Sequence, residues 1–222
     1  MEKNEFFKIL LDTVSREYSG MDNDSGVWRQ LLAEQPRTVP ELKISPQIKP
    51  EGININSNSS AVESTGTLSS ADMTALAKMV KDCHRCNLRG GCRQTVFGEG
   101  NYHADLMFVG EAPGAEEDAT GRPFVGKSGQ LLDKMIQAMQ FQRSEVFIGN
   151  IIKCRPPGNR NPMPEEADAC IGYLKRQIEL IKPKALVLLG ATPLLFLMNI
   201  SGIKRNRGKW LEYNGIPVMP TF

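Results

Sequence analysis

Four cysteines in this sequence have the spacing of ligands for a thiolate-bound metal centre. Two residues separate Cys83 from Cys86, which places two thiols on one turn of the chain. Cys154 follows an apolar run, and Cys170 lies on the inward side of a predicted helix. One close pair plus two single cysteines favours iron–sulfur, because zinc ribbons more often use two close pairs. Two alternatives stay open: Cys154 and Cys170 as plain buried thiols, and Cys92 as a competing ligand.

A second pattern, Gly121-Arg122-Pro123-Phe124-Val125-Gly126-Lys127-Ser128, matches the phosphate-binding loop G-x-x-x-x-G-K-S. Such a loop leaves a buried strand and enters a helix, and its backbone N–H groups surround the phosphates. Here the preceding residues 115–120 are acidic and are not a predicted strand, and Pro123 removes one backbone donor. No later strand is followed by the aspartate that would organise magnesium. We therefore interpret the match as accidental and do not favour a nucleotide hydrolase.

The composition is that of an ordinary globular protein. The chain has 222 residues, 41% of them apolar and 23% charged, which excludes collagen-like, wholly disordered and disulfide-scaffold proteins. No apolar run approaches the roughly 18–20 residues that cross a bilayer, and residues 1–20 lack the basic start of a signal peptide. We therefore expect a soluble, cytoplasmic protein without membrane contact, whose five cysteines serve thiol or metal chemistry rather than disulfides.

Charge and composition divide the chain into three parts. Residues 1–19 have apolar side chains at helical spacing, which predicts an amphipathic helix. Residues 20–69 contain four prolines and a run of serine and asparagine, and we expect a flexible linker there. The folded domain is predicted to span 70–222. The N-terminal helix is either a docking element for a protein partner or a frayed tail.

Apolar runs alternate with helical patterns inside the predicted domain. The runs at 106–110, 146–149, 185–190 and 217–219 predict buried strands. Helices are predicted over 70–80, over a segment with Leu131, Leu132, Met135, Ile136 and Met139 on one side, and over 164–181. This alternation predicts an α/β fold with three αβα layers and a central, mainly parallel four-stranded sheet. Ligands bind beyond the carboxyl ends of such strands, so the residues after each run are the candidates for chemistry.

Several short segments together have the order of a known family. They are Cys83-x-x-Cys86, Gly110-Glu111-Ala112-Pro113-Gly114 with Glu116-Glu117-Asp118, Gly121-x-Pro123-Phe124-x-Gly126, Asn150-Ile151-Ile152-Lys153-Cys154-Arg155-Pro156-Pro157 with Asn159-Arg160, Cys170, and Arg207-Gly208-Lys209-Trp210. From about Asp82 to Phe222 the chain resembles the family 4 uracil-DNA glycosylases, the iron–sulfur branch of that superfamily. The family's Gly-x-Pro-Phe-x-Gly loop accounts for the accidental phosphate-loop match. By resemblance, a [4Fe–4S] cluster is held by Cys83, Cys86, Cys154 and Cys170, and Cys92 is free.

The resemblance implies a DNA-repair enzyme that flips uracil out of DNA, hydrolyses its N-glycosidic bond and leaves an abasic site. Phe124 is similar to the aromatic residue that stacks on the base. Asn150 resembles the residue that accepts uracil N3–H and donates to O4, a pattern that cytosine reverses. Glu111 would lie near the sugar, where a carboxylate stabilises positive charge and helps to place the attacking water. Ala112 is small enough to let backbone N–H groups approach the departing uracil oxygen.

A basic run near the C-terminus is suited to DNA phosphates. It consists of Lys204, Arg205, Arg207 and Lys209. Residues 81–222 hold nineteen basic and fourteen acidic side chains, against eight and eleven in residues 1–80, which is compatible with a polyanionic partner. Taken alone, the candidate residues also fit ordinary roles: a core phenylalanine, a turn-capping asparagine, a surface glutamate and a solvated basic loop.

One family segment, His-Pro-x-x-Leu-Leu-Arg, would begin directly after Phe222, and the histidines of this chain, His84 and His103, lie elsewhere. We therefore expect a chain that is incomplete at its C-terminal end. Loss of that histidine, which would stabilise charge at uracil O2, is expected to lower glycosylase activity by ~10²–10³. The second hypothesis is a non-catalytic, replication-associated iron–sulfur module that binds DNA, related to segments of phage DNA polymerases. In either case we expect a monomer.

Overall fold

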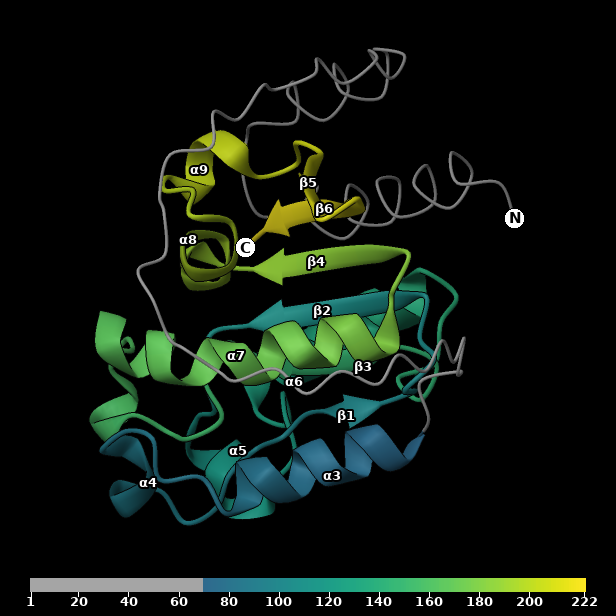
Figure 1. Ribbon diagram of the computed structural model, residues 1–222. Helices are drawn as coiled ribbons and strands as arrows, with labels where there is room; N and C mark the ends of the chain where they lie inside the picture. The colour runs from purple at the N-terminus through teal and green to yellow at the C-terminus, as the bar shows by residue number, and fades with distance from the viewer. Residues whose placement is uncertain (1–69) are drawn as a thin grey trace, which may run out of the picture. The chain divides into compact units, whose positions relative to one another are not determined.

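The computed structural model describes residues 70–222, and the side chains from residue 71 onward. A six-stranded sheet lies at its centre, with the strand order β1-β3-β2-β4-β6-β5 (Figure 1). The strands are β1 (Glu99–Gly100), β2 (Leu106–Gly110), β3 (Phe147–Asn150), β4 (Ala185–Leu189), β5 (Leu211–Tyr213) and β6 (Ile216–Thr221). The expected N-terminal helix over 1–19 and the linker over 20–69 lie outside the described residues.

Four neighbouring strands, β3, β2, β4 and β6, run parallel to one another. They correspond to the four apolar runs, so the prediction of an α/β fold with a mainly parallel sheet is confirmed. The expected number of strands is wrong by two. The short strands β1 and β5 pair antiparallel with β3 and β6 and form the two edges of the sheet.

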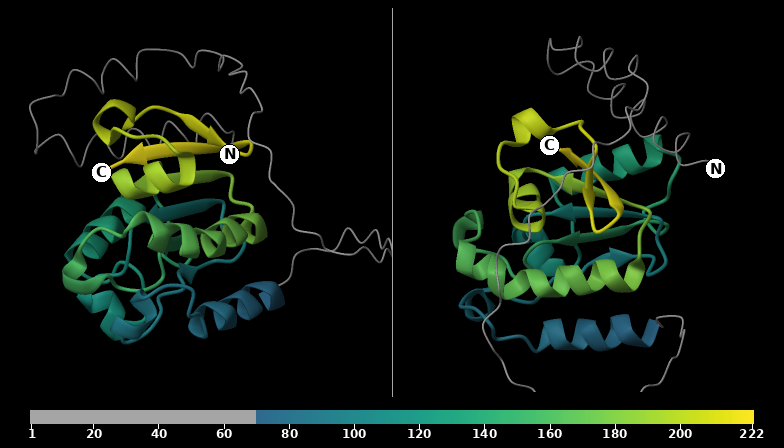
Figure 2. Two further views of the ribbon diagram at one scale, coloured as in Figure 1. Left: turned by 60° about the vertical axis from the view of Figure 1, so that its left-hand side comes forward. Right: turned by 45° about the horizontal axis from the view of Figure 1, so that its top comes forward.

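Helices cover both faces of this sheet. They are α3 (Ser70–Lys81), α4 (Leu88–Gly91), α5 (Ala115–Thr120), α6 (Lys127–Ala138), the 3-10 turn η1 (Pro157–Asn159), α7 (Pro164–Ile181), α8 (Ala191–Met198) and α9 (Ile203–Asn206). Figure 2, right, shows α7 and α3 on one side of the sheet and α6 on the other. On that side α3 packs against α7, and α7 in turn packs against α8.

The central strands are apolar throughout because each is covered on both faces. Every residue of β2 and β3 is buried, as are the first four residues of β4. The inward side of α7 is also as predicted: Cys170 and Leu174 are both buried. One prediction for α6 is wrong, since Leu131 is 45% exposed and Leu132 alone of that pair turns into the core.

The rejection of the phosphate-loop match is supported by the fold. The segment before Gly121 is the helix α5, so this loop joins two helices and does not leave a strand. Lys127 and Ser128 are exposed in the first turn of α6. Among the described helices, none has the length and apolar character needed to cross a membrane.

Candidate functional site

The carboxyl ends of β2 and β3 bring two predicted site residues together. Gly110 and Asn150, the last residues of these strands, are opposite each other in the parallel register. The pairing continues beyond the strands: the N–H of Ile151 donates to the carbonyl of Gly110 at 2.9 Å, and that of Ile152 to Glu111 at 3.1 Å. In Figure 1 the arrowheads of β2, β4 and β6 point to this same edge.

Asn150 is 1% exposed, and its side-chain oxygen has no hydrogen-bond partner among the described residues. Gly110 allows this oxygen and the ring of Phe124 to lie close together over its α-carbon. A methyl group on Gly110 would lie 2.5 Å from Oδ1 of Asn150 and would also collide with the tip of the Phe124 ring. The structure therefore brings the tip of the Phe124 ring and the side-chain oxygen of Asn150 close together over Gly110.

Phe124 lies in the turn between α5 and α6 and is half-buried. Its φ of +50° is in the left-handed region, which a bulky non-glycine residue adopts rarely. The ordinary alternative, a fully buried core phenylalanine, does not describe this residue.

Glu111 directly follows β2 and is also half-buried. Its side-chain Oε2 accepts a hydrogen bond from the hydroxyl of Thr192 at the start of α8. Glu111, after β2, is therefore linked to α8, which follows β4. With Asn150 at the end of β3, three strand ends contribute to one edge of the sheet. Ala112 is half-buried beside Glu111. Thr192 was missed from the sequence, although it follows an apolar run by three residues and could have been considered on that ground.

A buried polar network supports this edge of the sheet, and no pattern in the sequence indicated it. The ammonium group of Lys153 donates to Oε1 of Gln177 at 2.7 Å and to the main-chain oxygen of Asn150 at 3.0 Å. Gln177 in turn donates to the carbonyl of Phe97 at 2.9 Å. Burial lowers the pKa of Lys153 to about 8, and the Cys170 thiol opposes that shift. This network joins α7 to the segment that follows β3.

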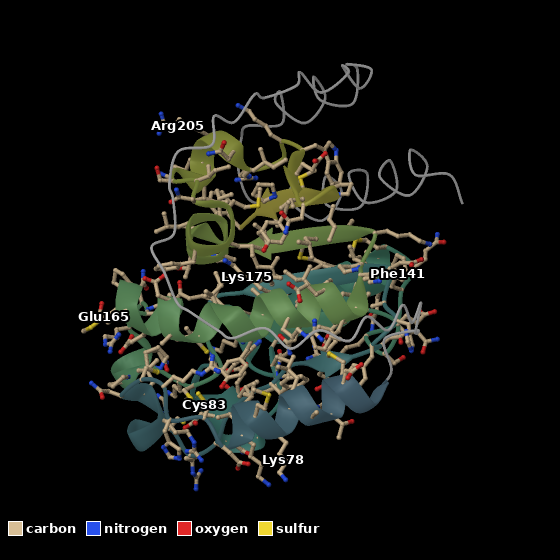
Figure 3. The ribbon with its side chains drawn as sticks, in the orientation of Figure 1. Lys78, Cys83, Phe141, Glu165, Lys175 and Arg205 are labelled. Atoms are coloured by element: carbon tan, nitrogen blue, oxygen red, sulfur yellow. The ribbon has the colours of Figure 1, made fainter. Side chains whose placement is uncertain are left out.

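The four predicted ligand cysteines line a single hollow, next to apolar side chains such as Val80 and Ile152. They come from the turn between α3 and α4, the segment after β3, and α7. Figure 3 shows Cys83 between the ribbons of α3 and α4. Cys92 does not belong to the described residues that line the hollow. It is buried, and its thiol lies beside that of Cys154.

Burial dominates the electrostatics of two of these thiols, Cys154 and Cys170. It raises the pKa of Cys170 to about 11, although Lys153 acts against this through its charge and through an N–H bond to the sulfur at 3.3 Å. Burial also raises the pKa of Cys154, to which the adjacent Cys92 thiol adds. Without a cation these groups stay protonated, and a bound metal centre would supply the positive charge that holds them as thiolates. The donor set therefore fits a thiolate-ligated centre.

Within residues 71–222, no three histidine, cysteine, aspartate or glutamate side chains are grouped as ligands of one metal ion. What the structure brings together is four sulfurs around a shared hollow.

The predicted basic run lies on α9 and in the segment before β5. Lys204, Arg205 and Lys209 are exposed, and Figure 3 shows Arg205 pointing outward from α9. Arg207 is half-buried, with its guanidinium group 4.5 Å from the ring centre of Phe222. Figure 1 shows α9 near the edge to which β4 and β6 point, so the basic run and the candidate pocket lie at the same end of the sheet.

Comparison with known proteins finds similar sequences. A family model described as the uracil DNA glycosylase superfamily matches residues 97–222. The chain is 44% identical over 155 residues to a type-4 uracil-DNA glycosylase of Thermotoga maritima, covering 68% of this chain and 80% of that protein. It is 42% identical over 161 residues to a type-4 uracil-DNA glycosylase of Saccharolobus solfataricus, with 68% and 74% covered. A DNA polymerase of Bacillus phage SP01 is 31% identical over 124 residues, which are 55% of this chain and 13% of the polymerase.

Proposed function

Because this chain belongs to the type-4 uracil-DNA glycosylases of the uracil DNA glycosylase superfamily, we propose that the carboxyl edge of its sheet binds a uracil flipped out of DNA. The reaction is hydrolysis of the N-glycosidic bond, which releases free uracil in DNA repair. The second hypothesis, a non-catalytic replication module, is not favoured, since the phage polymerase is less similar than the glycosylases and is matched over less of this chain.

One observation carries the assignment of the pocket: the buried side-chain oxygen of Asn150 lacks a partner among the described residues. A buried acceptor without a donor costs about 1–3 kcal/mol, so such a group in a folded protein indicates a missing ligand. Uracil offers an N3–H donor beside the O4 acceptor, and the amide of Asn150 can complement both. Cytosine presents the opposite pair and would leave two buried groups unsatisfied.

Phe124 supplies the stacking surface in this proposal. Its ring lies beside the Asn150 oxygen above Gly110, so a pyrimidine whose edge bonds to the amide can stack on the ring. Stacking of this kind contributes about 1–3 kcal/mol per base and does not distinguish uracil from cytosine. Affinity and selectivity therefore come from different residues, Phe124 and Asn150.

Glu111 is the proposed catalytic carboxylate. Cleavage of the N-glycosidic bond builds positive charge on the sugar, which a nearby carboxylate stabilises, and the same group helps to place the attacking water. The Thr192 hydroxyl bonded to one carboxylate oxygen fixes the orientation of this side chain. Backbone N–H groups near Ala112 are proposed to approach the departing uracil oxygen.

The four cysteines around the hollow, Cys83, Cys86, Cys154 and Cys170, are proposed to hold a [4Fe–4S] cluster. When bound, such a cluster supplies a covalent link between the α3–α4 turn, the segment after β3 and α7. That segment begins at Asn150, so the link would stabilise the backbone that carries the base-selecting amide. Support comes from the shared hollow and from the N–H bond to the Cys170 sulfur.

DNA is the polyanionic partner in this proposal, and the basic run of Lys204, Arg205, Arg207 and Lys209 is proposed to bind its phosphates. Contacts of this type give affinity without sequence preference. The protein partner of the N-terminal helix, the monomeric state and the cytoplasmic location stay predictions from the sequence.

The decisive experiment compares release of uracil and of cytosine by Asn150→Asp and by the unchanged protein. Single-turnover assays with excess enzyme use DNA with one uracil, or one cytosine, opposite guanine, and abasic sites are detected by alkaline strand cleavage. We expect the uracil-to-cytosine rate ratio to fall roughly 10- to 100-fold in Asn150→Asp. Asn214→Asp, in the exposed turn between β5 and β6, is the matched control and should keep the ratio.

Two results would contradict the proposal. An unchanged ratio in Asn150→Asp would remove that residue from base selection. Binding of DNA without release of uracil by any variant would instead favour the non-catalytic module.

A further inference from the structure

Phe124 has a backbone conformation that needs support from its surroundings. For a bulky residue, a φ of +50° costs of order 1–3 kcal/mol and persists only where neighbouring groups hold it. The other non-glycine residues with positive φ in the described chain are three asparagines, one glutamine and one lysine, of which asparagine tolerates this region more readily. The strain therefore lies at the residue that carries the aromatic face of the pocket.

Arg143 binds the carbonyl side of this turn. Its Nη2 donates to the carbonyl of Pro123 at 2.5 Å, and its Nη1 donates to the carbonyl of Phe124 at 3.3 Å. The guanidinium group is itself fixed by carboxylates of Glu99, at 3.2 Å, and Asp133, at 2.7 Å. A planar fork with five donors can contact two successive carbonyls and two carboxylates at once, which the three donors of a lysine cannot do.

Glu117, in α5, binds the N–H side of the same turn. Its Oε1 accepts from the N–H groups of Val125 at 2.9 Å and Gly126 at 3.0 Å, and its Oε2 accepts from Gly114 at 3.0 Å. Burial alone would raise the pKa of Glu117, but these backbone donors outweigh it and the pKa is lowered. The carboxylate therefore stays ionised, which strengthens its grip on the two N–H groups after Phe124.

We propose that Arg143 and Glu117 are positioning residues that hold the Phe124 turn between them, so that the ring faces the Asn150 amide before a base arrives. The two charged groups act on opposite sides of one strained residue: carbonyls at 123 and 124, N–H groups at 125 and 126. Neither side chain touches the base in this arrangement. The inference rests on the proposed role of Phe124 in stacking, and its effect is to prepare the ring for binding.

The first test reports on the ring itself and needs no catalysis. 4-Fluorophenylalanine at position 124 gives a ¹⁹F NMR signal that is sensitive to the ring's surroundings. We expect Arg143→Ala and Glu117→Gln to shift or broaden this signal. Arg122→Ala is the matched control, because Arg122 bonds Glu99 at 2.7 Å through two nitrogens, whereas among the described residues the carbonyls of the turn accept from Arg143 and not from the Arg122 guanidinium. A signal unchanged in Arg143→Ala and Glu117→Gln would overturn the proposal.

The second test is a double-mutant cycle on binding. DNA containing one 2′-fluoro-2′-deoxyuridine resists cleavage, so its dissociation constant can be measured. We expect Phe124→Ala to weaken binding roughly 5- to 100-fold. When Phe124 is present, Arg143→Ala should weaken DNA binding by up to the same factor as Phe124→Ala. In the Phe124→Ala background, Arg143→Ala should weaken binding by less than about twofold. Equal factors in both backgrounds would show that Arg143 acts independently of the ring.

Arg143→Lys decides the question if Arg143→Ala does not fold. Lysine keeps the charge beside Glu99 and Asp133 but has too few donors for both carboxylates and both carbonyls, so we expect a folded protein with an altered ¹⁹F signal. An unaltered signal in this variant would contradict the proposal. A Phe124→Ala variant with unchanged binding would instead contradict the stacking role, which separates failure of the proposed function from failure of this inference.

Discussion

The ammonium group of Lys153 donates a hydrogen bond to the main-chain oxygen of Asn150 across 3.0 Å. Lys153 is 1% exposed, and its second bond, to Gln177, ties the same group to α7. One buried side chain therefore supports the backbone of Asn150, whose amide is the proposed base-selecting group, while the backbone N–H of Lys153 bonds the sulfur of Cys170. The pocket and the thiol centre share a single structural support.

Lys153→Met should lower the free energy of unfolding by about 2–5 kcal/mol. Methionine keeps the apolar stem but leaves the oxygens of Asn150 and Gln177 without their donor, at about 1–3 kcal/mol each. Urea unfolding measures the change. Lys175→Met is the control, because Lys175 is exposed on α7, the helix that carries Gln177 (Figure 3). It should change the free energy of unfolding by no more than about 0.5 kcal/mol. Equal effects of the two substitutions would contradict a stabilising role for the buried network.

The sequence could predict the four central strands because double-sided burial requires unbroken apolar runs. The edge strands β1 and β5 could not be found in this way: they have two and three residues, and each contains a glutamate. Asn150 and Phe124 were found through family motifs. Their supporting residues were not, since the bonds from Arg143 to Pro123 and from Lys153 to Gln177 join positions 20 and 24 residues apart. Such partners become neighbours only in the folded chain.

Gly129→Ala should destabilise the protein by about 1–3 kcal/mol, although alanine is the better helix former. The added methyl group would collide with the main-chain carbonyl of Phe124, which lies against α6 at this glycine. Gly172→Ala is the matched control in α7, where no atom lies within 4 Å of the new methyl group, and it should stabilise by about 0.4–1 kcal/mol. Denaturant unfolding of both variants gives the comparison, and a stabilised Gly129→Ala would show that the turn can move away.

Glu166→Gln should reduce stability at pH 7, and the difference from the unchanged protein should narrow in acid. Two hydrogen bonds from Arg160, at 2.6 and 2.8 Å, hold the pKa of Glu166 below its ordinary 4.5; burial opposes this, and the Met163 N–H adds to it. A carboxyl group whose pKa is lower in the folded than in the unfolded state stabilises the folded protein at pH values above its unfolded-state pKa. This contribution is lost as the pH falls through the folded-state pKa.

Urea unfolding at pH 7 and at a series of values below ~4.5 follows the Glu166→Gln difference. Glu179→Gln, which breaks the exposed pair with Arg176, should have little effect at either end of the range. A difference for Glu166→Gln that does not depend on pH would contradict the linkage.

Cys170→Ser and Cys154→Ser should each lose the proposed cluster, whereas Cys92→Ser should keep it. The first two thiols line the shared hollow, but Cys92 is not among the described residues that do so, although it lies beside Cys154. Anaerobic purification followed by visible absorption near ~400 nm, together with iron and sulfide content, measures the cluster. Colourless unchanged protein with stoichiometric zinc would reverse the assignment of the metal. Loss of iron in Cys92→Ser, with iron retained in Cys170→Ser, would show that Cys92 is a cluster ligand. The residues that line the hollow would then not be the ligand set.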